Sequence, residues 1–191
     1  SPHRYPPPMP ADPIPVRTES PIAPADVELL LLDVDGVLTD GSVIVNDPGE
    51  HTLRFNTRDG FGIALWHQAG LRVGVITGRK TDALKHRLEG NGIDLVIQGA
   101  RDKAEGLRQM VELSGESPDR MAFLGDDWID GPVMRRVGYP MAVADAEPDI
   151  RRISTFITAR PGGRGAVRDA VEHLLIARGV LDQARARYDL S

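Results

Sequence analysis

The sequence contains no cysteine among its 191 residues. Thiol catalysis, disulfide bonds and zinc–thiolate sites are therefore excluded. No apolar run approaches the roughly 20 residues that a membrane-spanning helix needs. The five histidines are scattered without the spacing of metal ligands, and each is interpreted as an ordinary surface or half-buried histidine.

The charge balance is moderately acidic, with a formal net charge of −5. This argues against nucleic acid or an anionic membrane surface as the main partner. Apolar residues make up 41% and charged residues 27%, which is typical of a soluble globular protein. The length suffices for one α/β domain. No signal-peptide pattern is visible, so the expected location is cytoplasmic.

Proline is concentrated at the start of the chain, where nine of the fifteen prolines lie in residues 1–26. Proline is excluded from helix interiors and central strands, so this segment is predicted to be an extended arm. The domain organisation predicted from the sequence is an arm over residues 1–26, a folded domain over residues 27–178 and a polar C-terminal tail over residues 179–191.

Short apolar runs alternate with helical patterns after the arm. Strands are expected at 27–32, 71–76, 95–97, 121–124 and 141–143, and helices at 59–69, 81–89, 102–113, 129–137 and 167–178. Residues 42–45 and 51–55 flank a turn sequence and predict a β-hairpin. Asp59 is predicted to cap the first helix. The alternation predicts an α/β fold, with a Rossmann-like parallel sheet, helices on both faces and a hairpin flap.

Polar residues follow the predicted strands where each strand ends. The first strand leads into Asp33-Val34-Asp35-Gly36 and the second into Thr77-Gly78-Arg79. Lys103 follows the third strand after a short loop, and Gly125-Asp126-Asp127 follows the fourth. Ligands of such sheets bind beyond the carboxyl ends of the strands. These side chains are therefore expected to converge on one site.

The residue types in this group indicate phosphoryl transfer. A carboxylate nucleophile repels a phosphate dianion unless a divalent cation lies between them, and Asp33 and Asp126 are natural side-chain ligands for Mg²⁺. Asp35 lies two residues beyond Asp33, so in an extended strand both side chains share one side. One can attack while the other transfers a proton. Thr77 and Lys103 can hold the phosphoryl oxygens.

Four segments together resemble the motifs of the haloacid dehalogenase superfamily, in their usual order: residues 33–41 (DVDGVLTDG), residues 76–79 (ITGR), Lys103 and residues 125–130 (GDDWID). The resemblance implies a phospho-aspartyl intermediate on Asp33, with Asp35 as general acid and then base. By the same resemblance, the phosphate is bound by Thr77, Gly78 and Lys103. The metal ligands are Asp33, Asp126 and the backbone carbonyl of Asp35. Asp127 and Asp130 are outer-shell groups.

The spacing of the motifs leaves no room for a cap domain, because only about 35 residues separate Gly41 from Thr77. The hairpin and residues 55–63, 125–134 and 160–175 resemble the capless subfamily of 3-deoxy-D-manno-octulosonate 8-phosphate phosphatases. That resemblance implies hydrolysis of this sugar-acid phosphate in lipopolysaccharide precursor synthesis. It also implies a homotetramer with sites at the subunit interfaces.

The resemblance further suggests which residues contact the sugar acid. The candidate substrate-binding residues are Thr39, Arg58, Asp59, Gly60, Arg79 and Arg164. Arginine recognises a carboxylate through a bidentate fork, which suits the carboxylate that this substrate carries far from its phosphate. The proline-rich arm and Gly131 depart from the subfamily pattern.

Three alternatives remain open from the sequence. A phosphatase of a nine-carbon sugar acid would share the architecture, although Arg58-Asp59-Gly60 favours the eight-carbon acid. A signalling receiver domain would also phosphorylate an aspartate beside Mg²⁺, but its acidic pair is adjacent and its acceptor lies on a later strand. An inactive assembly module is disfavoured because every expected chemical group is present.

Overall fold

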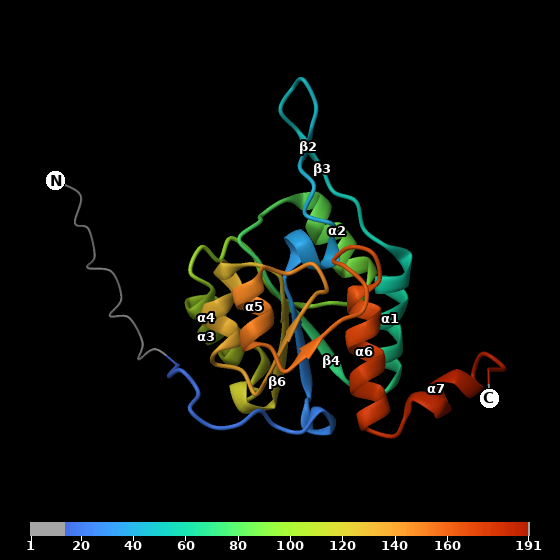
Figure 1. Ribbon diagram of the computed structural model, residues 1–191. Helices are drawn as coiled ribbons and strands as arrows, with labels where there is room; N and C mark the ends of the chain where they lie inside the picture. The colour runs from blue at the N-terminus through green and yellow to red at the C-terminus, as the bar shows by residue number, and fades with distance from the viewer. Residues whose placement is uncertain (1–13, 191) are drawn as a thin grey trace.

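A computed structural model describes residues 14–190 (Figure 1). Its centre is a six-stranded parallel sheet with strand order β5-β4-β1-β6-β7-β8. The strands are β1 (Leu29–Leu32), β4 (Arg72–Ile76), β5 (Leu95–Ile97), β6 (Met121–Gly125), β7 (Tyr139–Ala142) and β8 (Phe156–Ile157). The predicted fold class is confirmed, and the described residues contain no cap domain.

Helices cover both faces of the sheet. The longer ones are α1 (Thr57–Gln68), α2 (Asp82–Gly90), α3 (Lys103–Ser114) and α6 (Ala166–Ala177), and the shorter ones are α4 (Gly131–Met134), α5 (Pro148–Ile153) and α7 (Leu181–Ala186). In Figure 1, α1 and α6 lie side by side on one side of the sheet, and α3, α4 and α5 lie on the other. Because helices cover both faces, all four leucines of β1 are fully buried.

The direction of the connections changes at β1. From β1 the chain moves to β4 and then to β5, and after α3 it returns to the opposite side of β1 to form β6, β7 and β8. Such a switch point leaves a crevice beyond the carboxyl end of the central strand. The loops that follow β1, β4 and β6 therefore surround one location, and this location holds the candidate site.

The predicted β-hairpin projects beyond this edge of the sheet (Figure 1). Its strands, β2 (Ile44–Val45) and β3 (His51–Thr52), are antiparallel and shorter than the sequence predicts. Three of its apolar side chains are exposed, with exposed fractions of 66% for Val43, 44% for Ile44 and 53% for Val45. A hairpin without a packed face cannot extend its pairing far, which explains the short strands.

Two local predictions are wrong in detail. Asp59 does not cap the first helix, because α1 begins earlier and Asn56 accepts a hydrogen bond from the backbone N–H of Arg58 as its N-cap. The helix expected over residues 129–137 is replaced by a 3₁₀ turn, η4 (Trp128–Asp130), and the single turn of α4. Pro132 at the start of α4 and the side-chain bonds of Asp127 and Asp130 hold the chain in this tighter path.

The arm and the tail are described in part. Residues 1–13 of the predicted arm and residue 191 of the predicted tail lie outside the described residues. The remainder of the arm lies along the domain, where the N–H of Arg17 donates to the carbonyl of Arg135 and the N–H of Ile22 to that of Gly138. The domain boundaries themselves stay a prediction. Among residues 14–190, no helix is long and apolar enough to cross a membrane.

Candidate active site

Three strand ends place the first side chains of the site. β1 pairs with β4 on one side and with β6 on the other. Asp33 follows β1, Thr77 follows β4 and Asp126 follows β6, so the topology brings them to one edge. A pocket of about 380 Å³ lies there. It is lined by Asp33, Asp35, His51, Thr77, Gly78, Arg79, Lys80, Thr81 and Ile129.

An irregular turn, η2 (Val34–Leu38), carries the chain away from Asp33. Gly36 lies at φ +85°, where a Cβ atom would lie 2.0 Å from a carboxylate oxygen of Asp126. Only glycine allows this approach. The buried hydroxyl of Thr39 accepts from the N–H groups of Gly36 and Gly41 and donates to the carbonyl of Val34. Thr39 therefore stabilises this turn, and it does not line the pocket.

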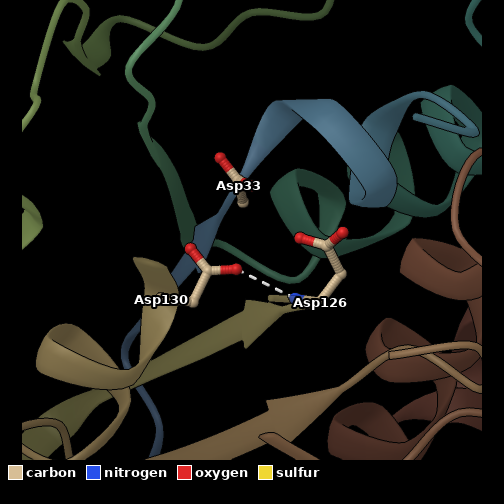
Figure 2. A group of neighbouring side chains, drawn as sticks. All are labelled: Asp33, Asp126 and Asp130. Atoms are coloured by element: carbon tan, nitrogen blue, oxygen red, sulfur yellow. Dashed lines mark hydrogen bonds between the residues drawn. The ribbon is translucent and has the colours of Figure 1, made fainter. Parts of the chain in front are cut away.

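A cluster of three carboxylates combines Asp33, which lines the pocket, with Asp126 and Asp130 (Figure 2). One oxygen from each lies within 4.8 Å of the others. Lys103 Nζ lies 2.7 Å from Asp33 and 2.5 Å from Asp130, and it is 2% exposed. The other oxygen of Asp130 accepts from the N–H groups of Asp126 and Asp127. Asp130 thus fixes both Lys103 and the backbone of Asp126.

The cluster is short of positive charge. Burial and the neighbouring carboxylate of Asp130 raise the pKa of Asp33 to about 7, although Lys103 acts against this rise. Burial and the carboxylates of Asp130 and Asp33 raise the pKa of Asp126 to about 8. Burial alone would lower the pKa of Lys103, but the carboxylates of Asp33 and Asp130 outweigh it and the pKa is raised. A single ammonium therefore does not neutralise two buried carboxylates and the half-buried one of Asp126.

One oxygen of the cluster has no partner. Asp126 Oδ1 is buried and makes no hydrogen bond within residues 14–190. Hard divalent cations prefer carboxylate oxygens, and an added positive charge would relieve the repulsion between Asp33 and Asp126. Asp130 is already occupied by Lys103 and by backbone N–H groups. The donor set therefore fits a divalent cation held chiefly by Asp33 and Asp126.

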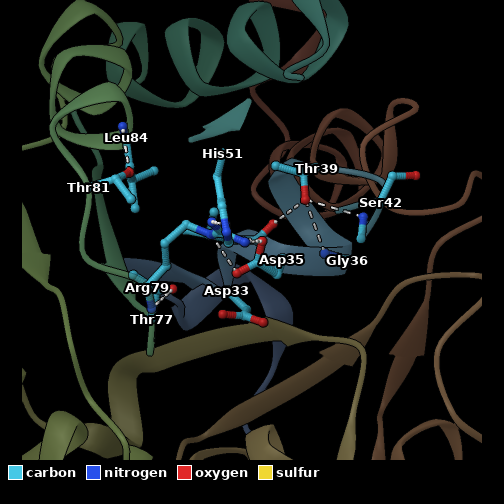
Figure 3. Close-up of polar contacts among 12 residues, drawn as sticks. Asp33, Asp35, Gly36, Thr39, Ser42, His51, Thr77, Arg79, Thr81 and Leu84 are labelled. Atoms are coloured by element: carbon cyan, nitrogen blue, oxygen red, sulfur yellow. Dashed lines mark hydrogen bonds and ion pairs between the residues drawn. The ribbon is translucent and has the colours of Figure 1, made fainter. Parts of the chain in front are cut away.

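Asp35 faces the pocket in an ion pair with Arg79 (Figure 3). Arg79 Nε lies 3.0 and 2.9 Å from the two Asp35 oxygens, and Arg79 Nη2 lies 2.8 Å from one of them. His51 of the hairpin approaches the same guanidinium, with 3.5 Å between its Nδ1 and Arg79 Nη1. Arg79 and Asp35, both predicted site residues, are thus brought together.

Thr77 and Gly78, which directly precede Arg79, also line the pocket. Thr77 is 1% exposed, and its hydroxyl accepts from the N–H of Arg79 at 3.1 Å. Its backbone is fixed to the next strand, because its N–H donates to the carbonyl of Ile97 and its own carbonyl accepts from Ala100. Both residues therefore stand on a rigid strand end beside Asp33, where phosphate binding was predicted.

Other predicted substrate contacts lie outside the pocket lining. Arg58 is exposed in the first turn of α1, and Gly60 packs against Arg87 of α2. Asp59 is buried and accepts from backbone N–H groups at the start of α6. Arg164 is 64% exposed and lies 3.6 Å from Asp40. Within one subunit these residues do not meet Arg79.

Asp127, predicted as an outer-shell group, contacts the carboxylate cluster through its backbone N–H, which donates to Asp130, while its side chain caps η4. Its side chain accepts from the N–H of Trp128 at 2.6 Å. Asp130 is the residue that contacts Lys103, and a Cβ atom at Gly125 would lie 2.7 Å from its carboxylate. Four pocket residues were not predicted: His51, Lys80, Thr81 and Ile129. Lys80 and Thr81 directly follow the predicted Arg79, whereas no local signal marks His51 and Ile129, since their position depends on the hairpin and on η4.

The haloacid dehalogenase-like hydrolase family model matches residues 88–168. The chain is 40% identical over 173 residues to the 3-deoxy-D-manno-octulosonate 8-phosphate phosphatase of Salmonella typhi, covering 91% of this chain and 92% of that protein. The chain belongs to the haloacid dehalogenase-like hydrolase family. Its relatives are phosphoric monoester hydrolases, so the predicted enzyme class is confirmed and a receiver domain does not fit.

Solved structures of relatives share the fold. The phosphatase of the same name from Yersinia pestis superposes with a TM-score of 0.81 at 38% identity, covering 84% of this chain and 86% of that one. The Moraxella catarrhalis enzyme, determined in complex with magnesium, phosphate and KDO, gives a TM-score of 0.84 at 33% identity, covering 87% and 95%. The family assignment therefore holds in both sequence and structure.

Proposed function

We propose that this member of the family hydrolyses 3-deoxy-D-manno-octulosonate 8-phosphate to the free sugar acid and phosphate. The observation that carries the proposal is the position of Asp33, buried between Lys103 and the unpartnered carboxylate of Asp126 at the floor of a pocket that also contains Asp35. The named activity of the relatives supports the choice of substrate.

In the proposed reaction, Asp33 attacks phosphorus and the phosphoryl group passes to its carboxylate. The leaving sugar oxygen takes a proton from Asp35, which later removes a proton from the water that hydrolyses the phospho-aspartate. Lys103 and Thr77 hold the phosphoryl oxygens, with the backbone of Gly78 beside them. The rigid attachment of Thr77 and the pairing of Lys103 keep these groups in place.

The proposed cofactor is Mg²⁺, held by Asp33, Asp126 and the carbonyl of Asp35. When bound, it would neutralise charge between the nucleophile and the phosphate and stabilise the transition state. The raised pKa of Asp33 and Asp126 and the orphaned oxygen of Asp126 support such a site. The magnesium complex of the Moraxella catarrhalis relative supports the identity of the ion.

Arg79 is the proposed receptor for the sugar-acid carboxylate. Its guanidinium already pairs with a carboxylate, that of Asp35, at the pocket wall. Arg58 and Arg164 lie outside the pocket lining, so their proposed contacts require a neighbouring subunit or a substrate that reaches beyond the pocket.

The proposed assembly is a homotetramer in which one hairpin closes the site of a neighbour. The exposed Val43, Ile44 and Val45 support this arrangement. The cytoplasmic location stays a prediction.

The proposal is tested by phosphate release from three esters with Mg²⁺: the eight-carbon sugar-acid phosphate, a nine-carbon sugar-acid phosphate and an aryl phosphate. We expect strong preference for the eight-carbon ester, loss of activity in EDTA and recovery with added Mg²⁺. Faster turnover of the nine-carbon ester would reassign the substrate. Full activity in chelator would contradict the metal assignment.

A further inference from the structure

The loop between β8 and α6, here called the glycine loop (residues 160–165), packs directly on the turn that follows Asp33. The N–H of Gly163 donates to the carbonyl of Val37 at 2.8 Å. A Cβ atom at Gly162 would lie 1.7 Å from the carbonyl oxygen of Gly36, and one at Gly163 would lie 2.3 Å from the backbone N of Asp40. The two backbones are therefore in contact with no side chain between them.

Gly36 is enclosed from two directions. The glycine loop contacts its carbonyl group, and the carboxylate of Asp126 occupies the space where a Cβ atom of Gly36 would lie. Asp35 is its immediate neighbour in the chain. A shift of the glycine loop would therefore displace the backbone of Asp35 and press on the carboxylate of Asp126. Both of these groups belong to the proposed metal site.

A buried carboxylate fixes the far end of the glycine loop. Asp59, on α1, is 1% exposed. Its Oδ2 accepts from the N–H of Gly165 at 3.2 Å, and its Oδ1 accepts from Val167 at 3.0 Å and Arg168 at 3.3 Å. Asp59 does not line the pocket. It holds the loop to α1, while its three bonds satisfy N–H groups at the start of α6.

Asp145 fixes the near end of the same loop. Its carboxylate accepts from the N–H of Gly162 at 2.9 Å. Asp145 follows β7, and two residues later the N–H of Glu147 donates to the carbonyl of Asp126 at 2.8 Å. The glycine loop, the turn after Asp33 and the segment of Asp126 thus form one connected unit. Of the two carboxylates that hold the glycine loop, Asp59 is buried and Asp145 is exposed.

From this connection we infer that Asp59 is a positioning residue for the metal site. By holding the glycine loop against Gly36, it keeps the backbone of Asp35 and the carboxylate of Asp126 in the positions from which they would hold a divalent cation. The inference rests on the proposed function insofar as it takes Mg²⁺ as the cation. It replaces the predicted substrate contact of Asp59 with a role exerted through the loop.

The test compares Asp59→Asn with the wild-type protein. Asparagine keeps one acceptor oxygen, so it cannot serve both the N–H of Gly165 and those of Val167 and Arg168. Mg²⁺ affinity is measured by calorimetry and by the rise in melting temperature with Mg²⁺ concentration. We expect a loss of about 10–100-fold in Mg²⁺ affinity, as for other groups that orient metal ligands. Turnover at saturating substrate should fall, with KM changed much less.

The matched control is Val171→Ala, which removes buried volume from α6, the helix whose first N–H groups Asp59 accepts from, at a position outside the glycine loop. It should lower the melting temperature and leave Mg²⁺ affinity unchanged. Gly162→Ala, which presses the loop against Gly36 from the other end, should reproduce the Asp59→Asn effect if it folds. If Gly162→Ala does not fold, the Mg²⁺ affinity of Asp59→Asn alone decides whether the inference holds.

The outcomes separate the inference from the function on which it rests. If Asp59→Asn melts earlier but binds Mg²⁺ as tightly as the wild type, Asp59 is only a helix cap and the inference is overturned. If the wild type itself binds no Mg²⁺ and does not release phosphate from the sugar-acid ester, the proposed function fails first. A weakened Mg²⁺ affinity in Asp59→Asn but not in Val171→Ala supports the positioning role.

Discussion

At the scale of single residues, the chemistry depends on how burial affects the ionisation of the Asp33 carboxyl group. Its side chain is almost completely removed from solvent, and only Lys103 supplies a positive charge to it within the described residues. A carboxylate in this setting is a poor nucleophile while it holds a proton. The bound cation would therefore serve both to hold the phosphate and to keep Asp33 ionised.

Replacing Asp33 by asparagine should abolish turnover, with a loss of at least about 10³-fold, because the amide cannot form the acyl phosphate. The fold should persist, since Lys103 keeps its pairing with Asp130. Phosphate release measures the loss, and circular dichroism with thermal unfolding checks the fold. Activity close to that of the wild type would rule out Asp33 as the nucleophile.

Replacing Asp35 by asparagine should slow turnover by about 10²–10⁴-fold, the usual cost of a lost general acid and base. The defect should be smaller for an aryl phosphate, because its leaving group needs less protonation. The measurement is kcat for the two esters in parallel. An unchanged kcat for the sugar-acid ester would mean that Asp35 transfers no proton.

At the scale of elements, α6 does more than cover the sheet. Its N-terminus receives Asp59 from α1, and its middle packs His173 against β7 and β8. His173 Nε2 lies 2.8 Å from the hydroxyl of Tyr139, and its ring stacks on Phe156 with centroids 3.8 Å apart. These contacts bury the imidazole partly and favour its neutral form.

Burial lowers the pKa of His173 below its ordinary value. The unfolded chain then binds this proton more readily than the folded one, so the stability it contributes is present above about pH 6.5 and is lost as the pH falls toward the folded-state pKa. We expect acidification from about pH 7.5 to pH 5.5 to lower the melting temperature of the wild type relative to that of His173→Gln, because the raised pKa values of Asp33 and Asp126 act in the opposite direction equally in both proteins.

A suitable control is His86→Gln, since the His86 side chain on α2 is 80% exposed. Its substitution should leave the pH dependence of the melting temperature unchanged. Thermal unfolding of the three proteins at the two pH values makes the comparison. An equal change in melting temperature in the wild type and in His173→Gln would show that His173 does not contribute to the pH dependence.

At the scale of the whole molecule, the hairpin contributes His51 to the pocket and also projects from the domain (Figure 1). Ile129, which lines the pocket, and its neighbour Trp128 are 60% and 66% exposed. Apolar surface of this kind beside a site marks an interaction surface more often than an ordinary solvated face. A second copy of the chain is the partner that the proposed assembly places there.

The proposed homotetramer predicts four times the chain mass of 20.8 kDa in sedimentation. Ile44→Glu, which puts a charge on the hairpin, should lower the mass and reduce turnover together, because closure of the site would be lost. Leu113→Glu, at an exposed position of α3, should change neither. A wild-type protein that sediments as a monomer at working concentration would refute the assembly.

The sequence by itself determined the fold class and the four groups of reactive residues. Buried parallel strands require continuous apolar runs such as Leu29–Leu32, and such runs can be recognised in the amino-acid sequence. Asp33, Thr77 and Asp126 follow such runs directly, so the sheet topology alone brings them together. This is why the candidate catalytic centre could be predicted while its surroundings could not.

The tertiary structure decided what the other predicted residues do. Asp59, Thr39 and Asp127 look like site residues in sequence, yet each bonds to backbone N–H groups: Thr39 and Asp127 to groups within three residues of themselves, and Asp59 to groups of α6 that only the fold brings near. β8 is two residues long and gives no periodic signal, since its pairing with β7 defines it. Packing between distant segments sets the role of Asp59 and the contact of the glycine loop with Gly36, and no local pattern encodes such contacts.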